Sequence, residues 1–507
     1  MNRRSFIVGL SSLVGTRGRL AFAETGKPNL RVGVLSDIHV TALANANWFE
    51  KALRRFDADK VDAVLVTGDL GTWGKIRELE AVAATWFKVF PNDRRSDGGK
   101  VTRLFVTGNH DVEGWAYAGA KNKTLAEARA DGFFFRREEV WDRLFHERYE
   151  PVMVREVNGY TFVLRNWLLR LGGKKTAARY PFEQPYDDEA NPLKEVLARL
   201  GDRLSGRTFF YVQHDPMDNT VNAHWLLGGK RFGVGQDNGY ARSCLKGRRN
   251  CLALTGHSHF SLTDEESIWQ GEFTAVNCSC ARGFAFTRPG HENGFAVEDF
   301  NRKPPFEMDR FDHGSVRQGM VMDVFDDHVR FERFDLTYGH SLGPDWAVPL
   351  FAGGATVPPS GVPKYDFKAR AAAVRPPCFA ADATVTVSRV EKGYRRVQAG
   401  TAGLDKGYPH PQLRVTFPPV TTARSPSRGF DFRVVCSCRA DGQEVKVQER
   451  RVFSPNVYQA EARDVEPCVC NFPVAELQGR GEVRFTVVPY DCWGKEGAPL
   501  VSEWVKV

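Results

Sequence analysis

The stretch from Thr102 to Asp111 reads TRLFVTGNHD. It opens with β-branched, aliphatic and aromatic residues, which favour a strand, and it turns polar directly after Gly108. In open α/β sheets, ligands bind outside the carboxyl ends of the strands. The stretch therefore predicts a buried strand that presents Asn109, His110 and Asp111 at a binding edge.

Four other apolar runs end in the same way, with polar residues directly after a segment of strand length. Their endings are Ser36-Asp37-Ile38-His39, Gly68-Asp69, His214-Asp215-Pro216 and Gly256-His257-Ser258-His259. Helix-like stretches separate the runs, which is typical of an α/β core. Because the runs are far apart in the sequence, their meeting at one sheet edge would gather a single site.

The gathered side chains are two carboxylates, one amide and several imidazoles. This mixture of oxygen and nitrogen donors, without a thiolate, suits Mn, Fe or Zn. The donors suffice for two metal ions, an arrangement that clamps the attacking and leaving oxygens of phosphoryl transfer. Gly68, Gly108 and Gly256 stand directly before ligand candidates, where a side chain would crowd a tight turn.

Together the endings resemble the motif series of the calcineurin-like metallophosphoesterase superfamily: D-x-H, G-D, G-N-H-D, H and G-H-x-H, in order, over residues 30 to 335. The resemblance implies an α/β fold of two packed mixed β-sheets flanked by helices. It also implies two transition-metal ions, one held by Asp37, His39 and His259, the other held by Asn109, His214 and His257, and both bridged by Asp69.

The same resemblance implies how the reaction proceeds. A hydroxide on the metals would attack the phosphorus of a phosphodiester or phosphomonoester in line. His110 would donate a proton to the leaving oxygen, and Asp111 would orient His110 through a hydrogen bond. His39 matches the phosphodiesterase-like branch and slightly favours diesters. Purple acid phosphatases lack this histidine and carry a tyrosine after the G-D motif, where this chain has Leu70.

The first residues predict export. The paired Arg3 and Arg4 precede a short apolar run, and Ala21-Phe22-Ala23 offers a cleavage site. The pattern resembles a twin-arginine signal peptide over residues 1–23, which would place the mature protein in the periplasm or at the cell surface. An N-terminal amphipathic helix is the alternative. We expect no membrane anchor, because no later run reaches the roughly 20 apolar residues that a span requires.

The 507 residues are too many for one ordinary core. We expect a first domain over residues 28–340, a Gly- and Pro-rich linker over 341–364, and an all-β domain over 365–507. Short strand-like runs between Gly, Pro and Asp suggest a β-sandwich. Residues 485–502 resemble the closing hairpin of a fibronectin type III domain, although a different sandwich would have much the same pattern.

Charge and cysteine content bear on nucleic-acid binding and on disulfide formation. The net charge of +8 is mild for this length, and we interpret Lys246-Gly247-Arg248-Arg249 as a solvated loop rather than a nucleic-acid site. Of the ten cysteines, three pairs are Cys-x-Cys in strand-like runs, where buried thiols and disulfides are both open. The alternative to an enzyme is a retired phosphoesterase fold that contacts polysaccharide or protein through its C-terminal sandwich.

Overall fold

The computed structural model describes residues 26–117, 123–133, 137–167, 192–221, 239–281, 317–336, 339, 341–394, 409–420, 429–454 and 467–507. The predicted signal peptide, residues 1–23, lies outside this part of the chain. Among the described residues, no helix combines the length and the apolar character needed to cross a bilayer.

Two mixed sheets of six strands each form the first part of the chain, in the orders β12-β11-β10-β1-β2-β3 and β4-β5-β6-β7-β9-β8. β1, β2 and β3 are parallel, as are β5, β6, β7 and β9, so within each set the carboxyl ends lie at one edge. The bounds are β1 Leu30–Leu35, β2 Ala63–Val66, β3 Thr102–Phe105, β4 Val152–Val157, β5 Tyr160–Arg165, β6 Phe209–Val212, β7 Cys251–Thr255, β8 Ile268–Gln270, β9 Thr274–Asn277, β10 Gln318–Val324, β11 His328–Asp335 and β12 Trp346–Pro349.

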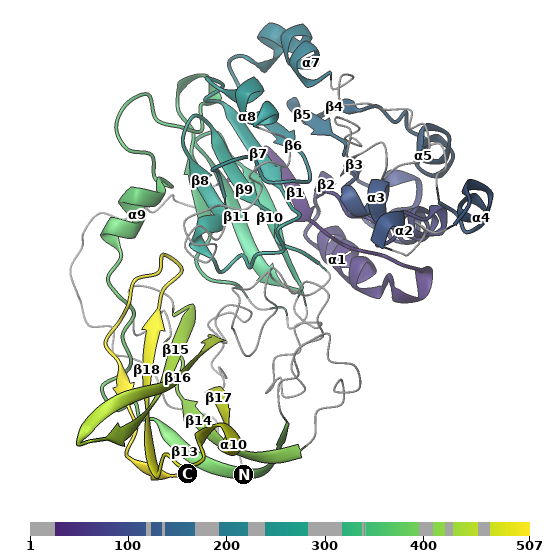
Figure 1. The fold of residues 1–507 in the computed structure, drawn as a ribbon. Coiled ribbons are helices and arrows are strands. Elements are labelled where there is room, and N and C mark those ends of the chain that lie inside the picture. Colours follow the sequence, from purple (N-terminus) through teal and green to yellow (C-terminus); the bar gives the residue numbers. More distant parts are fainter. Residues whose placement is uncertain are drawn as a thin grey trace, which may run out of the picture.

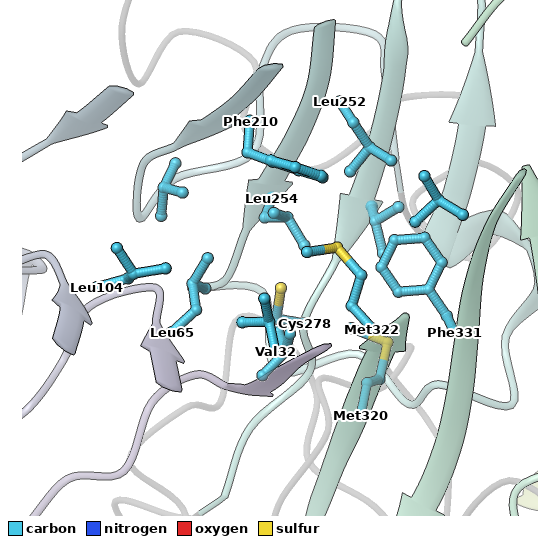
Figure 2. Packing of buried hydrophobic residues seen from close by; sticks show 14 of the residues in the cluster. Val32, Leu65, Leu104, Phe210, Leu252, Leu254, Cys278, Met320, Met322 and Phe331 are labelled. Atoms are coloured by element: carbon cyan, nitrogen blue, oxygen red, sulfur yellow. The ribbon is translucent and has the colours of Figure 1, made fainter. Parts of the chain in front are cut away.

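The two sheets pack face to face around one apolar cluster (Figure 2). Val32 and Leu65 of the first sheet and Phe210 and Leu254 of the second belong to it, together with Met322 of β10. All five side chains are fully buried. Burial of an aliphatic or aromatic side chain contributes roughly 1.5–3 kcal/mol, so this cluster is the main force that holds the sheets together.

Helices cover the outer faces of both sheets (Figure 1). On the first sheet, Phe56 of α1 and Trp86 of α2 pack into a second apolar cluster. On the second sheet, Leu197 of α7 and Leu245 of α8 pack into a third apolar cluster. The predicted α/β class with two mixed sheets is therefore confirmed. The helix bounds are α1 Asn47–Ala58, α2 Ile76–Val89, α3 Asn109–Tyr117, α4 Leu125–Ala130, α5 Arg137–Phe145, α7 Leu193–Leu200 and α8 Tyr240–Leu245.

Part of the segment that was expected to be a linker, residues 341–364, forms a strand. β12 pairs antiparallel with β11, and Trp346 and Val348 are buried in the cluster between the sheets. Tyr365 joins the same cluster. The sequence pattern does not reveal this strand, because its four residues stand between Gly- and Pro-rich stretches. The position of the domain boundaries stays a prediction.

Residues 386–506 contain the all-β part that the sequence predicts, which we call the C-terminal unit (Figure 1). Its sheets are β13-β14-β17 and β16-β15-β18-β19, with β20 paired to β18, and every pairing is antiparallel. The strands are β13 Thr386–Tyr394, β14 Pro409–Phe417, β15 Asp431–Ala440, β16 Gln443–Phe453, β17 Cys468–Pro473, β18 Glu482–Tyr490, β19 Leu500–Val501 and β20 Val505–Lys506. The short helix α10, Val474–Leu477, lies within the unit, and the short helix α9, Phe367–Ala373, precedes it.

All ten cysteines are free thiols. Cys436 and Cys438 of β15 and Cys468 and Cys470 of β17 are buried in the core of the C-terminal unit. The alternation that put Cys436 and Cys438 on a core-facing side of their strand is therefore confirmed. Burial raises the pKa of the Cys436 thiol to about 12, which keeps it protonated and inert as a nucleophile.

Candidate metal centre

The predicted site residues converge at the carboxyl ends of strands from both sheets. Directly after these strands stand Asp37 and His39 (β1), Asp69 (β2), Asn109 and His110 (β3), His214 (β6), and His257 and His259 (β7). The candidates form two groups, and within each group all ligand atoms lie within 4.8 Å of one another. One group contains Asp37, His39, Asp69 and His259, and the other contains Asp69, His214 and His257. The convergence expected from the sequence is thus present in the fold.

The loops that carry these residues have an unusual backbone. The left-handed region is occupied by five non-glycine residues, with φ of 50° at Asp37, 45° at His39, 51° at Asp69, 65° at His257 and 52° at His259. Such conformations cost on the order of 1–3 kcal/mol each and persist only where the surroundings fix them. Here the Asp37 N–H donates to the Gly68 carbonyl at 3.1 Å and the His39 N–H donates to the Asp69 carbonyl at 2.9 Å, which ties the two loops together.

The first group brings four buried ligand candidates together. His259 Nε2 lies 2.7 Å from Asp37 Oδ1, and His39 Nε2 lies 3.4 Å from His259 Nε2. His39 Nε2 also lies 3.8 Å from Asp37 Oδ1 and 3.6 Å from Asp69 Oδ2. Three ring or carboxylate atoms therefore surround His39 Nε2, in the close grouping that one shared ion requires.

The second group is centred on His214. Its Nε2 lies 3.2 Å from Asp69 Oδ2, 3.0 Å from Asn109 Oδ1 and 3.2 Å from His257 Nδ1. The other ring nitrogen, Nδ1, lies 2.8 Å from the Thr67 carbonyl oxygen. Because a carbonyl only accepts, this bond places a proton on Nδ1 and leaves the Nε2 lone pair of the neutral ring for a metal.

The charges of the cluster fit a pair of cations. Burial opposes ionisation of Asp37, but the neighbouring His259 and His214 outweigh it and lower the pKa of this carboxyl to about 2. Burial likewise opposes ionisation of Asp69, and His214 and His110 more than offset it, so its pKa is also lowered. Two ionised carboxylates and several imidazoles in a buried site are a donor set of the kind that transition metals prefer. The shared Asp69 gives the two groups a common ligand.

Three glycines make room for the ligands, as the sequence predicts. A Cβ on Gly68 would stand 2.5 Å from His214 Nδ1, and one on Gly108 would stand 2.5 Å from the Asp69 backbone nitrogen. A Cβ on Gly256 would overlap Ser36 Oγ and approach Asp37 Oδ2 to 2.7 Å. All three distances are shorter than real Cβ contacts, so any side chain there would displace a ligand loop.

His110 lies beside the two groups of ligand candidates and is half-buried. Its backbone N–H donates to Asp69 Oδ1 at 2.8 Å, and its ring makes an edge contact with His39 at a centroid distance of 4.8 Å. Its Nδ1 lies 2.7 Å from the Thr72 carbonyl oxygen, so the carbonyl orients the imidazole and leaves Nε2 as the nitrogen for proton transfer.

Asp111 does not have the partner that the sequence suggested. Its carboxylate accepts hydrogen bonds from the backbone N–H groups of Leu70 at 3.0 Å, Gly71 at 2.7 Å and Gly108 at 2.8 Å. The expected hydrogen bond from Asp111 to His110 is therefore wrong, because the carboxylate is turned toward the loops and Thr72 orients the imidazole instead. Burial and the charge of Asp69 raise the pKa of Asp111 to about 7.

Trp167 is a site residue that the sequence reasoning missed. Its ring lies 5.8 Å from the His214 ring and 6.0 Å from the His257 ring, centroid to centroid. Its Nε1 donates to Glu113 at 3.1 Å, and its backbone N–H donates to the Thr107 carbonyl at 3.1 Å. The signal was available, because Trp167 follows β5, which runs parallel to β6 and ends at the same edge.

The ligand candidates differ in how far they are buried. His110 and His257 are half-buried, whereas the other ligand candidates are buried. Asp37 and Asp69, for example, are exposed by 0% and 1%. Among the described residues, His110 and His257 are therefore the members of the centre with the most exposure.

Comparisons with known proteins agree with this geometry. Residues 30–261 match the family model of calcineurin-like phosphoesterases. That range contains all nine predicted site residues, from Asp37 to His259. The chain matches no curated protein sequence.

Several solved structures are similar at low identity. A dimetal phosphatase from Danio rerio is 11% identical, with a TM-score of 0.36, and the match covers 64% of this chain and 99% of that one. GAP50, the anchor in the inner membrane complex of Plasmodium, is 12% identical, with a TM-score of 0.34 and coverage of 68% and 92%. Vacuolar protein sorting 29 from Cryptosporidium parvum is 13% identical, with a TM-score of 0.24 and coverage of 64% and 97%. At these values, none of the three bears on what this chain does.

The family match and the buried cluster point to the same chemistry. The match covers the segment that supplies every strand end of the centre, and the two groups of Asp and His side chains are intact within it. The chain thus carries a calcineurin-like phosphoesterase domain over residues 30–261, and it is a metallophosphoesterase with a buried Asp/His metal-binding cluster.

Proposed function

We propose that the protein is an exported phosphoesterase that hydrolyses phosphodiesters or phosphomonoesters at a pair of Mn, Fe or Zn ions. The observation that carries the proposal is the position of Asp69, whose Oδ2 lies 3.6 Å from His39 Nε2 in one group and 3.2 Å from His214 Nε2 in the other. One carboxylate that faces both groups supports two ions held side by side.

The ligand residues would divide between two metal ions. Asp37, His39 and His259 would hold one ion, while Asn109, His214 and His257 would hold the other, with Asp69 between them. When bound, such a metal pair supplies Lewis-acid charge to phosphoryl oxygens and lowers the pKa of water. The strained loops fix the ligand side chains before substrate arrives, so little reorganisation is needed.

His110 would protonate the leaving oxygen. It is half-buried beside the ligand candidates, and the Thr72 carbonyl accepts a hydrogen bond from its Nδ1. With Nδ1 fixed, the proton on Nε2 is the one that can move to an alkoxide or phenoxide. Asp111 would act through the loops, because it accepts from the two backbone N–H groups that follow Asp69 and from the one that precedes Asn109.

Export is supported by the sequence alone, whereas the identity of the C-terminal unit is supported by its sequence and its sheet topology. The twin-arginine pattern over residues 1–23 supports a periplasmic or cell-surface location. A fibronectin type III-like identity for the C-terminal unit agrees with its two antiparallel sheets, and such a unit would contact polysaccharide or protein.

The test is hydrolysis by the mature protein loaded with Mn, assayed on bis-p-nitrophenyl phosphate and on p-nitrophenyl phosphate. We expect turnover of at least one ester, and we expect Asp69→Asn to lose a factor of at least roughly a hundred in kcat together with metal content. Asp142→Asn is the matched control, since it makes the same change on the exposed side of α5. The proposal fails if the loaded protein cleaves neither ester while Asp69→Asn binds as much metal as the parent.

A further inference from the structure

A second cavity lies away from the metal centre. It measures about 450 Å³, within the range typical of small-molecule sites, and we call it the basic pocket. Its lining includes Leu204, Arg248, Arg249, Asn250, Phe351 and Gly353.

The basic pocket is at the opposite ends of two strands that serve the metal centre. Leu204 and Asn250 stand before β6 and β7, which begin at Phe209 and Cys251. The ligand candidates His214 and His257 follow the other ends of the same strands. The two sites are therefore separated by the length of a strand, and one ligand cannot occupy both.

The charged side chains of the lining are two arginines, Arg248 and Arg249. Arg248 is half-buried, and its Nε makes a single long hydrogen bond of 3.4 Å to the Cys244 carbonyl. Arg249 Nη2 donates to the Val357 carbonyl at 3.0 Å and to the Pro358 carbonyl, so Arg248 is the guanidinium with fewer protein partners. Within the described ranges, neither arginine pairs with a carboxylate, and no acidic side chain lines the cavity. A half-buried guanidinium without a counter-ion favours an anionic ligand.

The backbone leaves open space around this charge. Gly206, Gly247 and Gly353 line the cavity with φ of 78°, 82° and 72°, and a Cβ on any of them would meet nothing within 4 Å. The three glycines therefore add no side chain to the cavity. Leu204 and Phe351 add an apolar wall. The cavity thus offers a charged end and an apolar side.

We propose that the basic pocket binds a small organic anion, a phosphate or carboxylate on an apolar or aromatic body, at a site separate from the metal centre. The guanidinium of Arg248 takes the anionic head, and the wall of Leu204 and Phe351 takes the body. The sequence Lys246-Gly247-Arg248-Arg249, interpreted above as a solvated loop, is then part of a binding site.

Calorimetric titration of the metal-loaded full chain with phenylphosphonate tests the proposal. We expect two classes of site, the metal centre and the basic pocket. Arg248→Gln should weaken only the second class, by roughly tenfold or more, because a charged hydrogen-bond partner is lost. Ala352→Trp, which fills the cavity from an exposed rim position, should do the same. Benzoate in place of phenylphosphonate tells whether the head group must be a phosphoryl group.

Arg199→Gln is the matched control, since it removes one positive charge from the exposed side of α7 and should leave both classes intact. Melting temperatures of all variants establish that the fold is kept, and inhibition of ester hydrolysis by phenylphosphonate reports the metal centre separately. One class of site in the parent, or identical titrations for the parent, Arg248→Gln and Ala352→Trp, would overturn the proposal whether or not the enzyme is active.

Discussion

Gly108 is the residue whose replacement should harm the metal centre most directly. A Cβ at this position would overlap Asp69 Oδ1 and stand 2.5 Å from the Asp69 backbone nitrogen. In Gly108→Ala we expect Asp69 to move out of line with both groups, with loss of bound metal and at least a tenfold fall in kcat/KM. Metal analysis and ester hydrolysis measure this. Gly26→Ala makes the same change where nothing lies within 4 Å, and it should behave like the parent.

Asp111 offers a test of the loop-holding role against the role in proton transfer. In Asp111→Asn, one oxygen becomes an amide that faces backbone N–H donors, which costs about 1–3 kcal/mol. We therefore expect a lower melting temperature and weaker metal binding. An unchanged melting temperature with a shifted pH–rate profile would contradict this and would return Asp111 to the support of His110.

At the scale of elements, the turn Asp491–Gly497 connects the C-terminal unit to α9. The Trp493 ring lies 5.5 Å from the Phe367 ring, and Lys495 Nζ donates to the Val374 carbonyl at 2.5 Å. Asp491 stabilises the turn by accepting from the Trp493 and Lys495 N–H groups at 2.9 Å and 2.8 Å. The turn therefore shapes the contact between the two parts of the chain.

The pH dependence of this turn has a definite sign. Burial outweighs the backbone donors of Lys495 and Trp493 and raises the pKa of Asp491 to about 6 from 3.8. The folded state then holds the proton more tightly than the unfolded state, so the contribution to stability is greatest below pH about 4 and is lost as pH rises through about 6. We expect Asp491→Asn to raise the melting temperature at pH 7.5 and to change it little at pH 4. Calorimetric scans at both values measure this, and a loss of stability at pH 7.5 would contradict it.

How much the sequence could predict depends on whether a feature is local. The strand ends before Asp37, Asp69 and His214 were predictable, because apolar runs and turn residues are read along the chain. The partner of Asp111 was not, because it depends on how closely the loop at Leu70 approaches in space. β12 escaped for a similar reason: four residues between Gly and Pro show no period of their own, and only pairing with β11 makes them a strand.

At the scale of the whole molecule, removal of metal should affect the two parts unequally. Without cations, the ionised Asp37 and Asp69 stay buried side by side, and the charge of Asp69 opposes the ionisation of Asp37. Cations that bind only the folded state therefore stabilise it. We expect chelation to lower the melting temperature of the α/β part and to leave the C-terminal unit unchanged. Scanning calorimetry with and without chelator measures this. A single transition that ignores chelator would contradict it.

Each half of the metal centre takes ligands from both sheets. In one group His259, from the second sheet, meets Asp37 and His39 from the first, and in the other His214 meets Asp69 and Asn109. The spacing of the two sheets therefore sets the spacing of the ligand atoms within each group. Side chains such as Met322 and Leu254 fill the space between the sheets and so fix their spacing, although the inter-sheet cluster contains no ligand (Figure 2). Substitutions that enlarge or shrink this apolar cluster would therefore be expected to shift the ligand groups relative to each other without touching any ligand.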